Sequence, residues 1–254
     1  MTALPFLDIS AFLAATDEHG AAAVEFAAAL TRASHEVGFV YLAGHGIDPA
    51  LEAAVFDAAR RFFDLPEADR LEIVNTNSPH FRGYTRLGHE HTNGVSDRRE
   101  QIDIGPEHPP REVPIDAPRW MRLRGPNQWP SAVPEMQPAV TRWMDEMARV
   151  GRAVLRALAI GLGQEPSLFD AVTSPDPEVL VKIIRYPAAP TTATVAGQVA
   201  GQGAVQGVGA HHDSGLITFI MQDDIGGLQV LRDGEFVDAV NVPGAYVLNL
   251  GEML

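Results

Sequence analysis

The segment Gly207–Asp223 reads GVGAHHDSGLITFIMQD, and its polar beginning leads directly into an apolar run. The run is rich in β-branched residues, which is typical of a β-strand. Turn residues such as DDIGG and NVPGA separate several segments of strand length here: LITFIMQ, LQVL, EFVDAV and YVLNL. Short antiparallel strands this close together predict a β-sandwich or a β-barrel.

Helices are predicted mainly before this β-rich region. Residues 18–36 are predicted to form an Ala-rich amphipathic helix, and residues 134–162 a long third helix. Between them a second helix begins at Asp48, whose side chain can cap it. The apolar stripe along the long helix predicts that it packs on a sheet. We therefore expect an α+β protein with the helices first and the barrel second. The expected division is an N-terminal region, 1–127, and a region with the long helix and the β-core, 128–254.

The composition restricts both the partners and the chemistry of the protein. The 254 residues carry a formal net charge of -14, so the basic surface that nucleic acid requires is not expected. The chain contains no cysteine, so a metal must be bound by His, Asp or Glu side chains. No apolar run is long enough to cross a bilayer, and the N-terminus lacks the pattern of a signal peptide. We expect a cytoplasmic protein that does not bind membranes.

The triplet His211–Asp213 is a candidate metal site. If the backbone is extended here, His211 and Asp213 lie on one face and His212 on the other, because strand side chains alternate. An imidazole beside a carboxylate suits Fe(II), Mn(II) or Zn(II), and a third ligand must come from elsewhere. Such triplets are also common among surface polar residues. From the triplet alone, a metal site and an ordinary polar turn both remain open.

The wider segment GAHHDSGLITFIMQDDIGGLQVL resembles the iron-binding segment of the isopenicillin N synthase-like family. Members of this family are non-haem Fe(II) oxygenases, and most of them depend on 2-oxoglutarate. Further segments occur in the family's order, so that the resemblance covers nearly the whole chain: PFLDIS, EVGFVYLAGHGID, RRFFDLP, FRGY, DRREQIDIG and IIRYP. The resemblance implies a double-stranded β-helix (jelly-roll) core flanked by N-terminal helices.

The resemblance also implies roles for single residues. His211 and Asp213 match two of the three iron ligands. Tyr186 matches a tyrosine whose hydroxyl contacts a carboxylate in the active site, which is that of 2-oxoglutarate in most members. A strand tyrosine packed on the core is the alternative. Arg82 resembles an arginine that meets a substrate carboxylate in some members, and a surface salt bridge is the alternative.

The remaining histidines are not expected to bind iron. His45 is expected to bond nearby backbone in a turn. The other loop histidines have no carboxylate at ligand spacing and are expected in solvent or in a substrate pocket: His80, His89, His91 and His108. In the family, the second histidine ligand follows the segment NLGEML, as do the arginine and serine that bind the far carboxylate of 2-oxoglutarate. This segment ends the chain at Leu254. We expect the third ligand and the last strands of the core to be absent from these 254 residues, which alone should not be active.

The implied activity is the oxidation of a small molecule by hydroxylation, desaturation or cyclisation. It would use Fe(II), 2-oxoglutarate as cosubstrate and O2, and it would release succinate and CO2. One alternative is an oxidase that needs no 2-oxoglutarate, as in isopenicillin N synthase. Others are a non-catalytic ligand-binding relative and, more distantly, a zinc hydrolase. The sequence identifies neither the substrate nor the oligomeric state.

Overall fold

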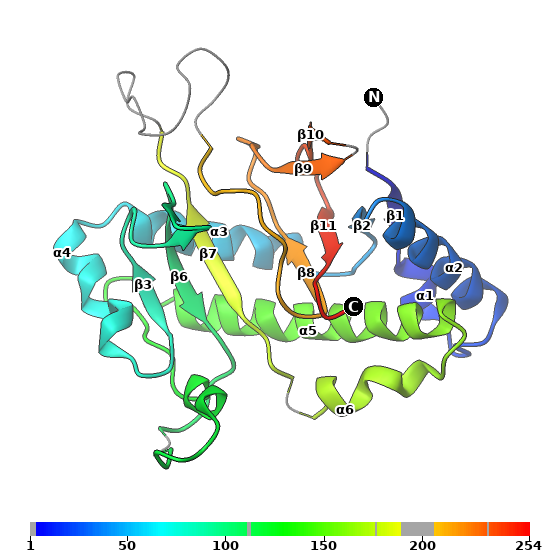
Figure 1. Cartoon of the computed structure of the whole chain (residues 1–254), viewed down its shortest axis with the longest axis horizontal. Coiled ribbons are helices and arrows are strands. Elements are labelled where there is room, and N and C mark those ends of the chain that lie inside the picture. The colour runs from blue at the N-terminus through cyan, green and yellow to red at the C-terminus, as the bar shows by residue number, and fades with distance from the viewer. Residues whose placement is uncertain (1–3, 111–112, 176, 189–205, 233) are drawn as a thin grey trace. The chain divides into compact units, whose positions relative to one another are not determined.

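The structure is a computed structural model that describes residues 4–110, 113–175, 177–188, 206–232 and 234–254. Helices and sheets are mixed, as predicted (Figure 1). The chain forms two compact units. Unit 1 consists of Met1–Asp57, Pro138–Glu178 and His212–Leu254, and unit 2 consists of Ala58–Gln137 and Val179–His211. The predicted division into residues 1–127 and 128–254 describes two stretches of the sequence, whereas each compact unit combines several stretches. The predicted division therefore stays a prediction.

Unit 1 is built on a four-stranded sheet in the order β1-β2-β11-β8. Its strands are β1 (Phe6–Asp8), β2 (Phe39–Ala43), β8 (Ile217–Ile220) and β11 (Ala245–Leu250). β1 pairs with β2 in parallel, and β11 pairs antiparallel with both β2 and β8. The expectation that the helices come first and the barrel second is therefore wrong. A strand from the N-terminal part of the chain, β2, pairs with residues 245–249 of β11.

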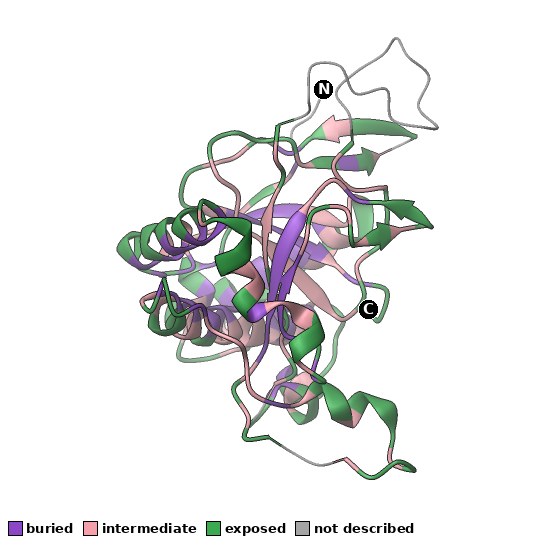
Figure 2. Ribbon diagram, turned by 90° about the vertical axis from the view of Figure 1, so that its left-hand side faces the viewer, coloured by how far each residue is buried: buried purple, intermediate pink, exposed green. Residues whose placement is uncertain are grey.

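Two long helices contribute to unit 1, namely α2 (Ala21–Glu36) and most of α5 (Met136–Gly161). The stripe predicted along α5 is buried, and its members are Val140, Trp143, Met144, Met147, Val150, Val154 and Leu158. Gly151 of this helix faces β8, because a Cβ there would lie 3.6 Å from Phe219. The long helix thus packs on the sheet, as predicted. In Figure 2 the helices are buried along one side and exposed along the other.

A β-hairpin of unit 1 consists of β9 (Gln229–Arg232) and β10 (Glu235–Asp238). A cluster of buried apolar residues joins this hairpin to the four-stranded sheet: Leu4, Tyr41, Val230, Ala239 and Val247. The hydroxyl of Tyr41 also donates a hydrogen bond of 2.7 Å to the carbonyl oxygen of Val240. The segments predicted as strands after the polar triplet are therefore confirmed as strands.

Unit 2 contains a three-stranded antiparallel sheet in the order β3-β6-β7. Its strands are β3 (Gly83–Thr85), β6 (Glu100–Ile104) and β7 (Val181–Arg185). Every residue of β6 is buried, in keeping with its central place. A small hairpin follows β3 along the chain, formed by β4 (His91–Thr92) and β5 (Val95–Ser96).

The remaining elements are helical: α1 (Ser10–Ala14), α3 (Pro49–Phe63), α4 (Glu67–Arg70), α6 (Asp170–Thr173), η1 (Leu71–Ile73), η2 (Asn75–Asn77), η3 (Arg119–Leu123) and η4 (Pro166–Phe169). The side chain of Asp48 accepts a hydrogen bond of 2.9 Å from the amide of Ala50, so it caps α3 as predicted. In the described part of the chain, no helix is both long and apolar enough to cross a membrane.

Close packing of α5 on α2 depends on Gly161. A Cβ at this position would lie 1.9 Å from Oγ1 of Thr31 and 2.7 Å from the carbonyl oxygen of Ala27. We expect Gly161→Ala to force the two helices apart and to lower the free energy of unfolding by about 1–3 kcal/mol. Urea denaturation measures this change.

Gly151→Ala is the matched control on the same helix. Its Cβ would meet the nearest side chain at 3.6 Å, which is an ordinary contact distance. Because alanine favours a helix over glycine by about 1 kcal/mol, this variant should be as stable as the natural protein or more so. Equal destabilisation by both substitutions would show that the close approach at Gly161 is not the cause.

Candidate active site

The triplet His211–Asp213 precedes β8, which begins at Ile217. No strand includes the triplet. The extended backbone assumed for these residues is therefore not part of a paired strand, and which histidine shares a face with Asp213 stays a prediction. The physical reason is Gly215, whose φ of 97° interrupts the β conformation between the triplet and the strand.

His211 lies at the end of unit 2. Its ring Nδ1 lies 2.8 Å from the carbonyl oxygen of Gly209. A carbonyl oxygen only accepts, so Nδ1 carries the proton of the neutral ring and Nε2 is the nitrogen that can bind a metal. Next to His211, the carbonyl oxygen of Ala210 accepts a hydrogen bond of 3.1 Å from the side chain of Asn93. The surroundings of His211 thus select the tautomer that a metal ligand needs.

Asp213 belongs to unit 1 and is partly buried. Its carboxylate oxygen Oδ2 accepts a hydrogen bond of 3.0 Å from Nδ2 of Asn249. Its backbone carbonyl accepts a second bond, of 2.9 Å, from the amide of Glu252. Asn249 is in β11 and Glu252 follows that strand. The end of β11 therefore holds both the backbone and the side chain of Asp213.

His212 is the local alternative to His211 as a ligand. Its side chain is 84% exposed, and its Nδ1 lies 3.4 Å from Oε1 of Glu252. An exposed pair of this kind contributes little to stability. The surroundings of His212 are largely solvent.

Tyr186 follows β7, and 49% of it is exposed. Its ring lies against Gly207, where a Cβ would be 2.4 Å from the ring atom Cδ1. Its hydroxyl bonds with Arg99, and that guanidinium lies 3.0 Å from the buried carboxylate of Asp97. Partial burial raises the pKa of the phenol, while Arg99 acts in the opposite direction. Since a guanidinium only donates, the Tyr186 oxygen accepts from Arg99 and its own proton can be donated elsewhere.

Arg82 is buried, with 5% of its surface exposed. Its Nη1 donates hydrogen bonds to the carbonyl oxygens of His80, at 3.0 Å, and Phe81, at 3.2 Å. The guanidinium packs on Gly105, where a Cβ would lie 2.1 Å from Nη2. A buried guanidinium bonded to backbone carbonyls is not a surface salt bridge, which was the alternative role for Arg82. The contact of Arg82 with a substrate carboxylate stays a prediction.

Two other histidines have structural roles. The ring Nδ1 of His45 accepts a hydrogen bond of 3.2 Å from the amide of Ile47, as predicted for a turn, and burial lowers its pKa. His80 departs from the expectation of a loop histidine in solvent or a substrate pocket. It is 7% exposed, and its Nδ1 lies 2.7 Å from the carbonyl oxygen of Arg122. It is buried because Gly125, which has no side chain, lies directly against its ring.

The contacts of His211 and Asp213 fit a metal site. Metal-binding histidines usually donate their other ring N–H to a carbonyl or a carboxylate, and metal-binding carboxylates are usually hydrogen-bonded as well. Within the residues that the structure describes, no group of three His, Asp or Glu side chains could hold a metal ion. His211 and Asp213 therefore stay predicted ligands, and no third ligand is found beside them in the described part of the chain.

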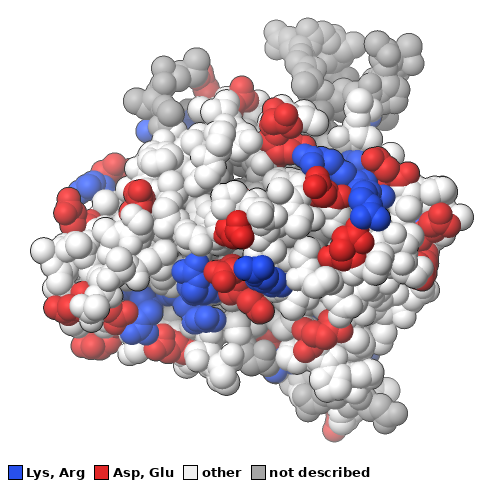
Figure 3. Space-filling model, turned by 180° about the vertical axis from the view of Figure 1, so that it is seen from behind, with Lys and Arg blue, Asp and Glu red and all other residues white. Residues whose placement is uncertain are grey.

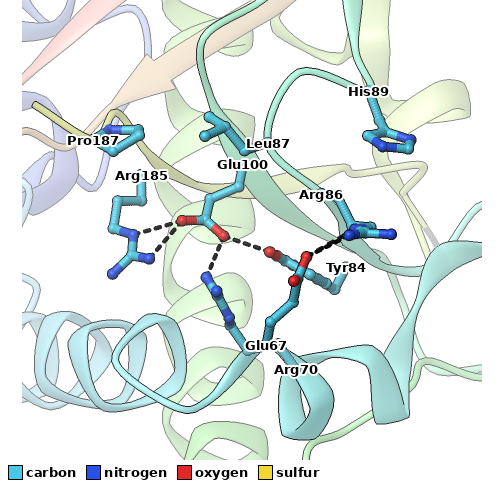
Figure 4. A pocket seen from close by; sticks show the side chains of 9 residues that line it. All are labelled: Glu67, Arg70, Tyr84, Arg86, Leu87, His89, Glu100, Arg185 and Pro187. Atoms are coloured by element: carbon cyan, nitrogen blue, oxygen red, sulfur yellow. Dashed lines mark hydrogen bonds and ion pairs between the residues drawn. The ribbon is translucent and has the colours of Figure 1, made fainter. Parts of the chain in front are cut away.

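A separate cavity of about 300 Å³ lies in unit 2 and is organised by Glu100 (Figure 4). The Glu100 carboxylate is 4% exposed and accepts hydrogen bonds from Tyr84 at 2.5 Å and from Nε of Arg185 at 2.7 Å. Arg70 pairs with the same carboxylate. None of the four predicted site residues lines this cavity. The Glu100 carboxylate bonds three side chains of this cavity, which favours a structural role.

Two family descriptions match the sequence. The N-terminal family of non-haem dioxygenases in morphine synthesis matches residues 4–132. The 2OG-Fe(II) oxygenase superfamily matches residues 178–254. The second stretch contains His211, Asp213 and Tyr186, and the first contains Arg82.

Curated relatives and solved structures agree with these matches. Homoarginine-6-hydroxylase 2-ODD-C23.2 of Arabidopsis thaliana is 35% identical over 257 residues, which cover 99% of this chain and 68% of the relative. Homoarginine-6-hydroxylase 2-ODD-C23 of Glycine max is 35% identical over 261 residues, which cover 100% of this chain and 76% of the relative. A full-length Neurospora crassa protein, solved in complex with alpha-KG and thymine, has a TM-score of 0.77 at 29% identity. The match covers 99% of this chain and 74% of the Neurospora chain.

The chain therefore belongs to the 2OG-Fe(II) oxygenase superfamily. It is a non-haem oxygenase that depends on Fe(II) and 2-oxoglutarate and uses O2, so the family, the activity and the cofactors implied by the resemblance are confirmed. Its fold is similar to that of solved members of the superfamily.

Asn249 contacts Asp213, and Arg99 contacts Tyr186. No motif in the sequence predicts a role for Asn249 or Arg99. Asn249 is 36 positions from Asp213, and only the pairing of β11 with β8 brings the two together. Arg99 stands in the charged segment DRREQIDIG, where nothing local distinguishes it from its neighbours.

Glu100 is expected to stabilise unit 2. Glu100→Gln removes the negative charge between Arg70 and Arg185. The guanidinium of Arg70, which is 14% exposed, loses the carboxylate with which it pairs, whereas Arg185 keeps a contact of 3.3 Å with Asp64. The free energy of unfolding should fall by about 2–4 kcal/mol. Urea denaturation followed by tryptophan fluorescence measures this change.

The control is Glu67→Gln, in the same cavity. Glu67 pairs with Arg86 at 2.7 Å, but the two side chains are 51% and 43% exposed. Solvent screens such a pair, so the loss should stay below about 1 kcal/mol. A loss from Glu100→Gln no larger than that from Glu67→Gln would contradict the structural role of Glu100.

Proposed function

We propose that Nε2 of His211 and the carboxylate of Asp213 are two of the protein ligands of the catalytic Fe(II). The third would be a histidine outside the residues that the structure describes. The hydrogen bond from His211 to Gly209 carries this proposal, because it selects the tautomer of a metal-binding ring. Bound Fe(II) supplies the reaction of O2 with 2-oxoglutarate that yields succinate and CO2 and oxidises the substrate. The protein residues hold the ligands and orient the carboxylates.

In the same proposal, the hydroxyl of Tyr186 donates a hydrogen bond to a carboxylate of 2-oxoglutarate. The contact with Arg99 supports this role, because it occupies the phenol oxygen as an acceptor and leaves its proton for a ligand. Arg82 is assigned to a substrate carboxylate by the resemblance alone, and its burial lends no support to that role.

We propose a small-molecule substrate. Two relatives are named as homoarginine hydroxylases, and the similar structure from Neurospora crassa holds thymine. These compounds share small size but not charge or shape, so homoarginine and thymine are the first two candidates to test. The names of the two relatives favour hydroxylation over desaturation or cyclisation. Neither the two relatives nor the Neurospora crassa structure supports an oxidase that works without 2-oxoglutarate.

The finer features of the fold and the cellular context belong to the same proposal. The strands would form a double-stranded β-helix, completed by strands that are not among those described. The proposal includes a cytoplasmic protein without nucleic-acid or membrane partners, and the net charge of -14 supports the absence of a nucleic-acid partner. On the face shown in Figure 3, Lys and Arg side chains lie beside Asp and Glu rather than forming a continuous basic surface.

The ligand assignment predicts the effects of three alanine substitutions in the full-length protein. His211→Ala and Asp213→Ala each remove an iron ligand, so each should abolish O2 consumption that depends on 2-oxoglutarate. Each should also weaken Mn(II) binding at least about tenfold, a change of roughly 1.4 kcal/mol or more. Magnetic resonance of the free Mn(II) ion measures this affinity without any turnover.

His212→Ala is the matched control, because it removes an adjacent imidazole that is exposed. It should leave Mn(II) affinity within about twofold and keep most of the activity, since exposed pairs contribute little. Circular dichroism checks that all three variants fold. If His212→Ala loses as much affinity as His211→Ala, the choice between the two histidines is wrong.

The role of Tyr186 predicts a change in the affinity for 2-oxoglutarate. Tyr186→Phe removes a hydrogen bond to a charged group, which is worth roughly 1.5–3 kcal/mol. The apparent KM for 2-oxoglutarate should rise about tenfold or more, as measured by succinate formation. Tyr41→Phe is the control, because it removes a hydroxyl that donates to the backbone carbonyl of Val240. It should leave the KM for 2-oxoglutarate unchanged. An unchanged KM in Tyr186→Phe would remove Tyr186 from the cosubstrate site.

A further inference from the structure

The end of β11 is bonded to the segment that carries Asp213. Beyond the paired residues of β11 and β8, three backbone amides in succession donate to this segment. Gly251 donates to Leu216 at 2.9 Å, Glu252 to Asp213 at 2.9 Å and Met253 to Gly215 at 3.0 Å. The residues just before β8 are therefore held in place although they form no strand.

Gly251 is the residue that allows this approach. A Cβ there would lie 2.4 Å from the carbonyl oxygen of Gly215 and 3.1 Å from that of Asp213. Real Cβ atoms do not come this close to backbone, so any side chain would push the two segments apart. The segment that carries the carboxylate is thus fixed by backbone contacts on one side.

Asn249 adds a contact with the carboxylate itself. The amide is 4% exposed, and its Nδ2 donates to Oδ2 of Asp213 at 3.0 Å. Its Oδ1 is buried and has no hydrogen-bond partner among the described residues. A buried acceptor without a donor opposes folding. Stability of the fold alone therefore does not explain an amide at this position, whereas the contact with Asp213 does.

We propose that Asn249 is a positioning residue that fixes the carboxylate of Asp213 for metal binding. This inference rests on the proposed role of Asp213 as an iron ligand. A carboxylate on a single bond from Cβ can rotate, and a donor on one oxygen selects one orientation before the metal arrives. Removing such a partner of a ligand typically weakens metal binding about 10–100-fold.

The test is Asn249→Leu in the full-length protein, because leucine is of similar size and has neither donor nor acceptor. Mn(II) is titrated into the metal-free protein, and free Mn(II) is followed by magnetic resonance. We expect Mn(II) affinity to fall about tenfold or more. Thermal unfolding of the metal-free variant should occur at the same temperature or higher, because the unpartnered buried oxygen is gone. A purely structural role would lower the unfolding temperature instead.

Asn241→Leu is the matched control, since it makes the same chemical change in the same unit at a partly buried position. It should leave Mn(II) affinity within about twofold, in keeping with a residue outside the site. If Asn249→Leu also stays within twofold while Asp213→Ala loses affinity, the positioning role is overturned and the iron site stands. If Asp213→Ala itself has no effect, the ligand assignment fails and this inference fails with it.

Discussion

The pairing of β11 with two strands at once is the constraint on which unit 1 depends. Residues 245–249 of β11 bond β2, and residues 247–250 bond β8. One strand therefore joins the N-terminal part of the chain to the segment that carries Asp213. The backbone beyond it continues to hold that segment up to Asp213 itself. The sheet and the segment with the proposed ligand Asp213 are thus parts of one hydrogen-bonded structure.

The two proposed ligands are oriented by different kinds of partner. Iron binding needs a neutral imidazole and an ionised carboxylate in fixed orientations. A backbone carbonyl sets the tautomer of His211, and an amide side chain orients the carboxylate of Asp213. Both of these partners are uncharged, so they orient the ligands without competing with the metal as ions. Tyr186 differs in this respect, because its partner Arg99 is a charged side chain that is itself paired with the carboxylate of Asp97.

Local patterns in the sequence predicted the elements but not their partners. The stripe on α5, the strand segments after the triplet and the cap of α3 depend on neighbouring residues, and all are confirmed. The pairing of β2 with β11 and the contact of Asn249 with Asp213 join distant positions that no periodicity connects. The triplet alone leaves a metal site and a polar turn open, and only the family resemblance matches His211 and Asp213 to iron ligands.

The place of β2 in the sheet has a consequence for synthesis on the ribosome. Its residue Ala43 pairs with Ala245, so about 200 residues are added between the two strands, which takes about 10–40 s at 5–20 residues per second. During that time β2 has only β1 beside it, and its apolar Val40 and Leu42 stand on an open edge. The nascent N-terminal segment is a ready template for pairing with other chains until its own late partner emerges. Protection by a chaperone is most useful during this interval.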